Sequence, residues 1–192
     1  MRHSMLRLAA VLALAGTAAA FPAHRTTEAP PPGFSGGFGE QSCTACHVGN
    51  PTNAFGGRVQ LTDLPDRYEP GAEYVVSVVL EAEETSVAGF QLTARFADGA
   101  NRGRTAGRLD PVDARTGVTD SAGVSYAHQS RVGSLATPDG SGAIWSLAWT
   151  APASGGPVSL HVAANSGNAD DSPLGDLVYT HEAVVEAKAP GA

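Results

Sequence analysis

The sequence predicts an all-β protein, a small antiparallel β-sandwich in a single domain. Glycine (23) and proline (13) are frequent among the 192 residues, which indicates many turns and short elements. Short apolar runs alternate with polar residues at period two, as in half-buried strands. No segment has the apolar period of a helix, so a helical bundle or coiled coil is excluded. Hydrophobic residues make up 42% of the chain, enough to form a core.

The N-terminal residues 1–20 are predicted to be a secretory signal peptide. Two arginines flank the start of a short apolar run at 8–15, and three alanines at 18–20 form a small-residue cleavage site before Phe21. The apolar run is shorter than the roughly 20 residues that span a membrane, and no second run of spanning length follows. We therefore expect an exported protein, periplasmic or extracellular, with no membrane span in the mature chain.

Charge limits the class of partner. The chain has 12 Lys+Arg and 19 Asp+Glu. Cleavage removes two arginines, so the mature chain carries ten basic and 19 acidic residues, a net charge of −9. An acidic surface repels phosphate backbones, so nucleic acid is not an expected partner. Solubility is a sufficient reason for the acidity.

An irregular arm is predicted over residues 21–56. Its first part, 21–42, is rich in proline and glycine and has no hydrophobic period, as expected of an extended segment or loop. The sandwich is predicted over 57–188, and residues 189–192 form a short tail.

Seven or eight strands are predicted at regular spacing within the sandwich. Polar, glycine-rich residues at 97–123 predict a long loop with room for one short strand. The period-two pattern places Trp145, Leu147 and Trp149 on one face of their strand, so both tryptophans are expected in the core rather than on a ligand platform. In chain order, the clearest strands cover 58–61, 74–80, 89–96, 124–128, 143–150, 158–162 and 177–185.

The chemistry of the sequence is concentrated in Cys43-Thr44-Ala45-Cys46-His47, which contains both cysteines of the chain. C-x-x-C-H is the attachment pattern for c-type haem. Two thiols three residues apart reach the two vinyl groups on one edge of a porphyrin. Cys43 and Cys46 are therefore predicted to hold one haem c covalently, and His47 to ligate its iron through Nε2. An acceptor for the Nδ1–H group is expected to fix the ring, and a backbone carbonyl is the expected acceptor.

Three other interpretations of the cysteine pair compete with haem. A thioredoxin-like dithiol sits at a helix start after a strand, whereas glycine-rich and polar residues flank this pair. A structural disulfide fits an oxidising compartment, but it stabilises little when the loop it closes is so short. A zinc site needs a second pair of ligands at finger-like spacing, and there is no other cysteine. Haem attachment is therefore preferred.

The number of methionines limits which residues can ligate the opposite face of the iron. Met1 and Met5 are the only two, and both leave with the signal peptide, so His/Met ligation is excluded. A histidine takes the position, or it stays open with water. The two C-terminal histidines are more readily explained as surface residues of their strands than as iron ligands. The histidines considered for the position are His24, His128, His161 and His181.

A polar loop at 165–176 offers several side-chain oxygens, as a Ca²⁺ site does. Its spacing does not match the calcium-loop pattern. Side chains of Asn and Asp that cap a turn explain the composition better. We therefore expect a turn here and leave calcium binding open.

Several short motifs occur in a fixed order along the chain. They are GEQSCTACH at 39–47, YEPGAEY at 68–74, AGFQL at 88–92, YAH at 126–128, WSLAWTAP at 145–152, AN at 164–165 and GDLVY at 175–179. Together they resemble a bacterial group of exported proteins with a Reeler-type β-sandwich, the choice-of-anchor V family, over about residues 33–179. The resemblance implies an immunoglobulin-like antiparallel sandwich preceded by a Gly/Pro-rich haem-binding arm. It also makes His128 the candidate distal iron ligand, because this residue matches a family histidine. The family's C-terminal anchor has no counterpart here, since the chain ends soon after its last strand.

The expected function is that of an exported monohaem c-type protein that transfers electrons to a redox partner protein and is not an enzyme. The haem is expected between the arm and the sandwich, partly covered by apolar residues such as Phe38 or Phe55. Ligation by two histidines implies a lower potential than His/Met ligation, whereas an open position permits ligand binding or peroxidase chemistry.

Two alternative functions stay open. One is an extracellular recognition or adhesion module in which haem is structural or sensory, which the Reeler resemblance motivates although a fold does not determine a function. The other is a thiol oxidoreductase without haem. The sequence predicts no oligomeric state.

Overall fold

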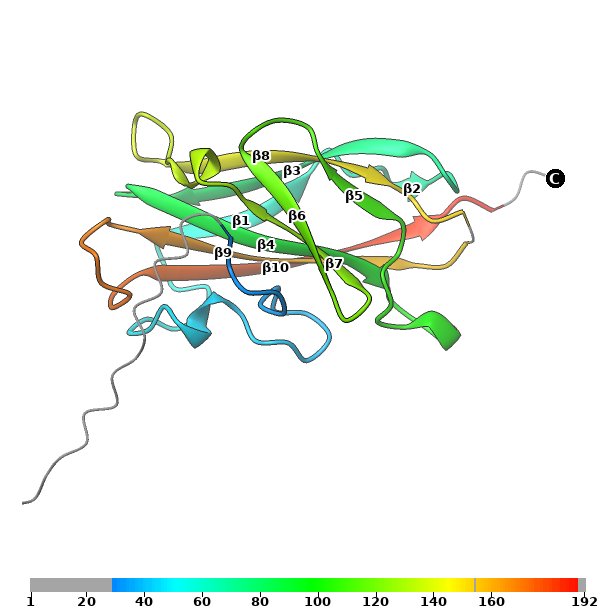
Figure 1. The fold of residues 1–192 in the computed structure, drawn as a ribbon, viewed down its shortest axis with the longest axis horizontal. Helices are drawn as coiled ribbons and strands as arrows, with labels where there is room; N and C mark the ends of the chain where they lie inside the picture. The colour runs from blue at the N-terminus through cyan, green and yellow to red at the C-terminus, as the bar shows by residue number, and fades with distance from the viewer. Residues whose placement is uncertain (1–28, 154, 190–192) are drawn as a thin grey trace, which may run out of the picture.

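Two packed β-sheets form the body of the protein (Figure 1). The computed structural model describes residues 29–153 and 155–189. The predicted signal peptide at 1–20, His24 and most of the predicted tail lie outside these residues, so those predictions are not tested. Within the described ranges the only helices are three short 3-10 turns, namely η1 (Cys43–Ala45), η2 (Gly99–Asn101) and η3 (Val132–Ser134). None of the described helices has the length and apolar character to cross a membrane.

Ten strands build the two sheets of the described chain. In spatial order, the smaller sheet consists of β1 (Gly57–Thr62), β3 (Glu73–Ala82), β8 (Gly142–Thr150) and β5 (Arg108–Pro111). The larger sheet consists of β2 (Arg67–Tyr68), β10 (Leu177–Ala187), β9 (Val158–Gly167), β4 (Val87–Phe96), β7 (Val124–Gln129) and β6 (Thr116–Ser121). The all-β, two-sheet sandwich that the sequence predicts is therefore confirmed.

Two details differ from the prediction. The segment 97–123, predicted as a loop with one short strand, contains both β5 and β6. Each is the last strand of its sheet, and such an edge strand has one neighbour and much exposed surface, so its apolar pattern is weak. In addition, β2 pairs with β10 in parallel over two residues, so the sandwich is not antiparallel throughout.

Alternate residues of the central strands fill the space between the sheets. Trp145, Leu147 and Trp149 of β8 are all buried there. Nε1 of Trp145 donates to the carbonyl of Gly133 at 2.8 Å, and Nε1 of Trp149 donates to the carbonyl of Ala106 at 3.1 Å. A buried indole N–H needs such an acceptor. The prediction that both tryptophans are core residues is therefore confirmed.

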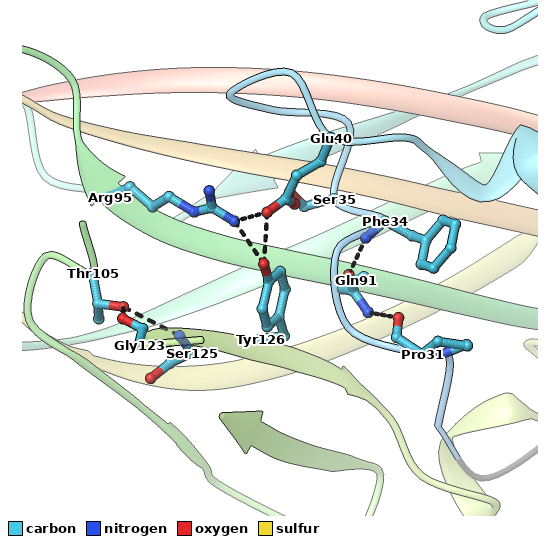
Figure 2. A network of polar contacts seen from close by, with 10 residues as sticks. All are labelled: Pro31, Phe34, Ser35, Glu40, Gln91, Arg95, Thr105, Gly123, Ser125 and Tyr126. Carbon is cyan, nitrogen blue, oxygen red and sulfur yellow. Dashed lines mark hydrogen bonds and ion pairs between the residues drawn. The ribbon is translucent and has the colours of Figure 1, made fainter. Parts of the chain in front are cut away.

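The arm before β1 lies on the outer face of the six-stranded sheet (Figure 1). The backbone N–H of Asn53 donates to the carbonyl of Val178 on β10 at 2.9 Å. On β4, Gln91 accepts from the N–H of Phe34 at 2.6 Å and donates to the carbonyl of Pro31 at 2.9 Å (Figure 2). The arm is irregular, as predicted, and it is tied to strands on either side of β9.

The register across the larger sheet gives positions on this outer face. His128 of β7 lies opposite Gln91 of β4, which lies opposite Ala163 of β9, which lies opposite Thr180 of β10. Neighbouring strands are about 4.8 Å apart. His128 and Thr180 are therefore about 14 Å apart across the sheet.

Candidate functional site

The five motif residues form one tight helical turn. Ser42 caps η1, and its Oγ accepts the N–H of Thr44 at 3.4 Å. The N–H groups of Cys46 and His47 both donate to the carbonyl of Cys43, at 3.1 and 2.9 Å. The two cysteines and His47 therefore belong to one turn, on which Cys46 is exposed and Cys43 is partly buried.

A carboxylate from the far end of the sequence holds His47. Nδ1 of His47 lies 2.6 Å from Oδ2 of Asp176, 129 positions later and immediately before β10. Asp176 is buried. An ionised carboxylate only accepts hydrogen bonds, so in the neutral ring Nδ1 carries the proton and Nε2 keeps its lone pair. Within the described residues no group bonds Nε2.

This contact corrects one detail of the sequence prediction. The expected acceptor for Nδ1–H of His47 was a backbone carbonyl, and that expectation was wrong. A carboxylate fixes the ring as a carbonyl does.

The loop that carries Asp176 is a series of side-chain-capped turns. The N–H of Asp170 donates to Oδ1 of Asn168 at 3.0 Å, the N–H of Ser172 donates to Oδ1 of Asp170 at 2.8 Å, and the N–H of Leu174 donates to Oγ of Ser172 at 3.1 Å. These are the turns that the composition of the loop predicts. Side-chain oxygens that were candidates for calcium accept backbone N–H groups of the loop before β10 instead.

The residue after His47 pairs with this loop. Val48 and Leu174 form a parallel bridge, and the N–H of Gly175 donates to the carbonyl of Val48 at 2.9 Å. The Val48 and Leu174 residues are 42% and 62% exposed. Two aliphatic residues therefore lie at the surface beside the His47–Asp176 pair, where an apolar group attached to the motif would pack against them.

Both thiols are free in this structure. Cys46 is exposed and Cys43 is partly buried, and this burial raises the pKa of the Cys43 thiol to about 12. A dithiol oxidoreductase activates its nucleophile by the opposite shift. Zinc is not favoured either, because no cluster of three or more His, Cys, Asp or Glu side chains in the described residues is arranged to hold a metal ion. Two thiols and an oriented imidazole on one turn are the groups that covalent attachment of a haem would use.

The structure does not bring His128 to the motif. The residue faces the arm side of the sheet, but it lies about 14 Å across the strands and about 13 Å along them from Asp176. Nε2 lies 3.0 Å from Oγ1 of Thr119, and Nδ1 lies 2.8 Å from the carbonyl of Gln129. The ring is buried between these partners. This placement disagrees with the predicted role of His128 as the ligand opposite His47.

The other two described histidines are placed differently. His161 points outward from β9, as predicted, but it lies under the arm: a Cβ on Gly37 would meet its ring at 2.2 Å, and Phe38 packs against it edge-on at 5.2 Å. Burial lowers the pKa of His161, although Glu182, 3.2 Å from its Nε2, acts to raise it. His181 follows on β10 and faces the side opposite to Glu182, because neighbouring strand residues alternate.

Of the two aromatic residues predicted to cover a haem, Phe38 is engaged elsewhere. Its ring packs on His161 and lies 5.3 Å from the guanidinium carbons of both Arg95 and Arg102. Such cation–π contacts dock the arm on the sheet. Phe55, just before β1, is fully exposed and is bound by no such contact within the described residues.

The chain is similar in fold to known two-sheet proteins. No family model matches it, and no curated protein matches it. The Reelin-N domain of F-spondin is 18% identical over 77% of this chain and 96% of its own, with a TM-score of 0.47. The human F-spondin reeler domain is 19% identical over 72% and 95% of the two chains, with a TM-score of 0.43. A cohesin module of a Clostridium perfringens family 33 glycoside hydrolase is 13% identical over 70% and 98%, with a TM-score of 0.45.

A buried ion pair fastens the arm to the sheet (Figure 2). Arg95 of β4 is 5% exposed, and its Nη2 donates to Oε1 of Glu40 in the arm. Tyr126 of β7 donates to the same oxygen at 2.6 Å and accepts from Nη2 of Arg95 at 2.9 Å. Ser35 donates to Oε2 of Glu40 at 2.8 Å. A buried guanidinium needs a counter-charge, so Arg95 has its counter-charge only while the arm is docked.

The same contacts set the charge of each partner. Burial alone would raise the pKa of the Glu40 carboxyl, but hydrogen bonds from Tyr126, Arg95 and Ser35, together with the charge of Arg95, hold it below its usual range. Burial and the hydrogen bond to Glu40 raise the pKa of Tyr126 to about 12. At neutral pH, Glu40 is therefore an anion and Tyr126 a neutral donor.

Reasoning from the sequence missed two residues of this site, Asp176 and Glu40. Both occur in motifs that carry the family resemblance, at 175–179 and 39–47. Each is an acidic residue at the border of a predicted element, where no strand pattern requires it. That combination was the available signal.

We expect Glu40→Gln to loosen the arm. The change leaves Arg95 buried without its counter-charge, which destabilises the docked state by about 3 kcal/mol. Tyr126→Phe keeps the ion pair, removes the bonds that the hydroxyl donates to Glu40 and accepts from Arg95, and is expected to cost about 2 kcal/mol. Hydrogen exchange of the backbone amides at 34–48 measures the difference, and equal exchange in the two variants would contradict this assignment.

The pH dependence of the wild-type arm provides the second half of this test. Folding lowers the pKa of Glu40 below the ordinary carboxyl value of 4.5. The contribution of Glu40 to the stability of the docked arm is therefore complete above about pH 4.5 and is lost as the pH falls through the lower pKa of the folded state. After correction for intrinsic rates, exchange at 34–48 should rise in this acidic window. The Glu40→Gln variant should lack that rise.

Proposed function

We propose that this protein is an exported haem c protein in which Cys43 and Cys46 hold one haem and His47 ligates its iron. One observation carries the proposal. The His47 ring shares a helical turn with both thiols and is fixed through Nδ1 by Asp176, which leaves Nε2 for a metal. A disulfide or a reactive dithiol has no use for an imidazole oriented in this way.

Attachment uses the thiols of this chain alone. Each S–H group adds across one vinyl double bond of the porphyrin: a carbon–sulfur bond forms, and the hydrogen goes to the neighbouring carbon, so no oxidant is needed. Cys46 is exposed and Cys43 partly so, which leaves both within reach of an incoming ring. When bound, the haem supplies a one-electron iron couple.

Asp176 acts as a positioning residue. Its carboxylate fixes the plane and tautomer of His47 and increases the electron density at Nε2. A haem held by His47 would have a lower reduction potential with this contact than without it, because a stronger donor stabilises ferric over ferrous iron. Asp176 is buried, and solvent screens the interaction only weakly.

The surroundings of the motif support exchange of electrons with a redox partner protein. Cys46 is exposed, and Val48 and Leu174 beside it in the site stand at the surface. A haem held by these residues would lie at the protein surface. The chain has a formal net charge of −7, which favours a partner with a basic docking surface.

Haem attachment is tested on protein produced together with a cytochrome c maturation system. We expect the pyridine haemochrome of the wild type to show the α band of a haem with two thioethers. Cys46→Ser keeps one vinyl group and should move that band to longer wavelength, and the double variant with Cys43→Ser should release all its haem to acidified acetone. Thr44→Ser is the control inside the motif. Absence of a c-type band from the wild type would overturn the proposal.

Asp176→Asn tests the role of the carboxylate. Haem should still attach, but the reduction potential should rise because the imidazole becomes a weaker donor. Glu186→Gln removes the same charge from an exposed position at the far end of β10 and should leave the potential nearly unchanged. A spectroelectrochemical titration measures both, and equal potentials in the two variants would show that Asp176 does not act on the iron ligand.

A second function, extracellular recognition without a redox role, is favoured by a different observation. The outer face of the four-stranded sheet, opposite the arm, exposes Val75 (54%) and Ile144 (50%) on the neighbouring strands β3 and β8. The partly exposed Val79 lies opposite Ile144 on the same face, and a contiguous exposed apolar patch on a sheet is typical of a contact surface. In this function haem, if attached, is structural.

The recognition function predicts binding that survives loss of haem. The double variant Cys43→Ser, Cys46→Ser should then bind immobilised polysaccharides or matrix proteins as well as the wild type does. Adding Val75→Lys and Ile144→Lys should weaken that binding at least about tenfold, a loss of about 1.4 kcal/mol. Val112→Lys, an exposed valine just after β5, is the matched control. Binding that needs haem, or that ignores the lysines, would exclude this function.

A further inference from the structure

Three described histidines besides His47 are candidates for the iron ligand, and contacts or strand orientation hold each of them away from the motif at 43–47. His128 is held on both ring nitrogens, by Thr119 and by the carbonyl of Gln129. Its Cε1 also packs against the backbone of Gly117, where an added Cβ would approach it to 2.9 Å. Moving this ring to an iron near Asp176 would break both bonds and require it to travel past two strands of its own sheet.

His161 is nearer to the arm but is covered by it. Gly37 lies so close over the ring that a Cβ there would approach its Cγ to 2.2 Å, and Phe38 packs on the ring edge. Its Nε2 faces Glu182 at 3.2 Å. If His161 moved to ligate iron, the arm would lose part of the surface against which Gly37 and Phe38 pack.

His181 lies on the face of its strand that is directed away from the arm. Thr180 and Glu182, its neighbours on β10, face the arm: the N–H of Thr180 bonds Asn53 of the arm, and Glu182 bonds His161. Successive side chains alternate across a strand, so His181 faces the opposite side of the sheet from His47. Thioether ligation is also lacking, because Met1 and Met5, the only methionines, lie in the predicted signal peptide.

We infer that a haem attached as proposed above would receive no second iron ligand from the described histidines of the sandwich and would bind a small exogenous ligand instead. The inference rests on the proposed function and extends it from electron transfer to ligand binding. The ligand class is a small molecule with one donor lone pair. Because Asp176 makes His47 a strong donor and favours ferric iron, anions such as cyanide should bind the ferric state.

The experiment uses the purified wild-type protein with its covalent haem. Without additive, the ferric absorption and electron paramagnetic resonance spectra should be high-spin. Imidazole or cyanide should convert them to low-spin, and carbon monoxide should shift the Soret band of the ferrous protein. The variants His128→Ala and His161→Ala should have the same starting spectra as the wild type.

Several results would overturn the inference. A low-spin spectrum that resists imidazole, cyanide and carbon monoxide would show that a side chain holds the position. If either variant then became high-spin, its histidine would be the ligand. His24, which lies outside the described residues, is tested in the same way with His24→Ala.

Failure of haem attachment and failure of ligand binding can be distinguished. Protein with a c-type haemochrome band but a closed sixth position would leave the proposed haem attachment standing and remove the open site. Protein without covalent haem would remove both.

Discussion

A buried guanidinium on the outside of a sheet determines where the arm of this protein lies. Arg95 projects from β4 into a position where water is largely excluded, and its counter-charge, Glu40, belongs to the arm. A buried cation without a partner is strongly destabilising, so the sheet and the arm are complete only together. Phe38 adds to this dependence, because its ring lies against both Arg95 and His161. An irregular segment with little secondary structure thereby acquires a defined course.

The second anchor of the arm is also its chemical site. The ring of His47 meets Asp176 at the start of β10, and the following residue, Val48, pairs with the loop before that strand. One hydrogen bond thus connects the position of the arm with the electronic state of the imidazole. Loss of docking at the Glu40 end would release that part of the arm, whereas the bonds of Val48, Asn50 and Asn53 to the loop before β10 and to β10 itself would remain.

The two faces of the molecule have different characters. The outer face of the larger sheet is covered by the arm and uses its polar side chains to hold it, with Gln91, Arg95 and Tyr126 all bonded to arm atoms. The outer face of the smaller sheet has no such cover within the described chain and exposes aliphatic residues. The proposed redox role would use the first face, and the alternative recognition role would use the second.

The sequence by itself determined the strands of the core and the reactive groups of the motif. Period-two runs such as 143–150 specify buried faces because strand geometry alone decides which residues share a side, and C-x-x-C-H brings its thiols and imidazole together through local spacing. The edge strands β5 and β6 escaped notice because exposure weakens that pattern. Only the tertiary structure decided that Asp176 accepts from His47, that Glu40 neutralises Arg95, and that His128 is occupied within its own sheet. These outcomes depend on hydrogen bonds between residues on different strands or tens of positions apart, and such bonds exist only once the sheets and the arm have packed.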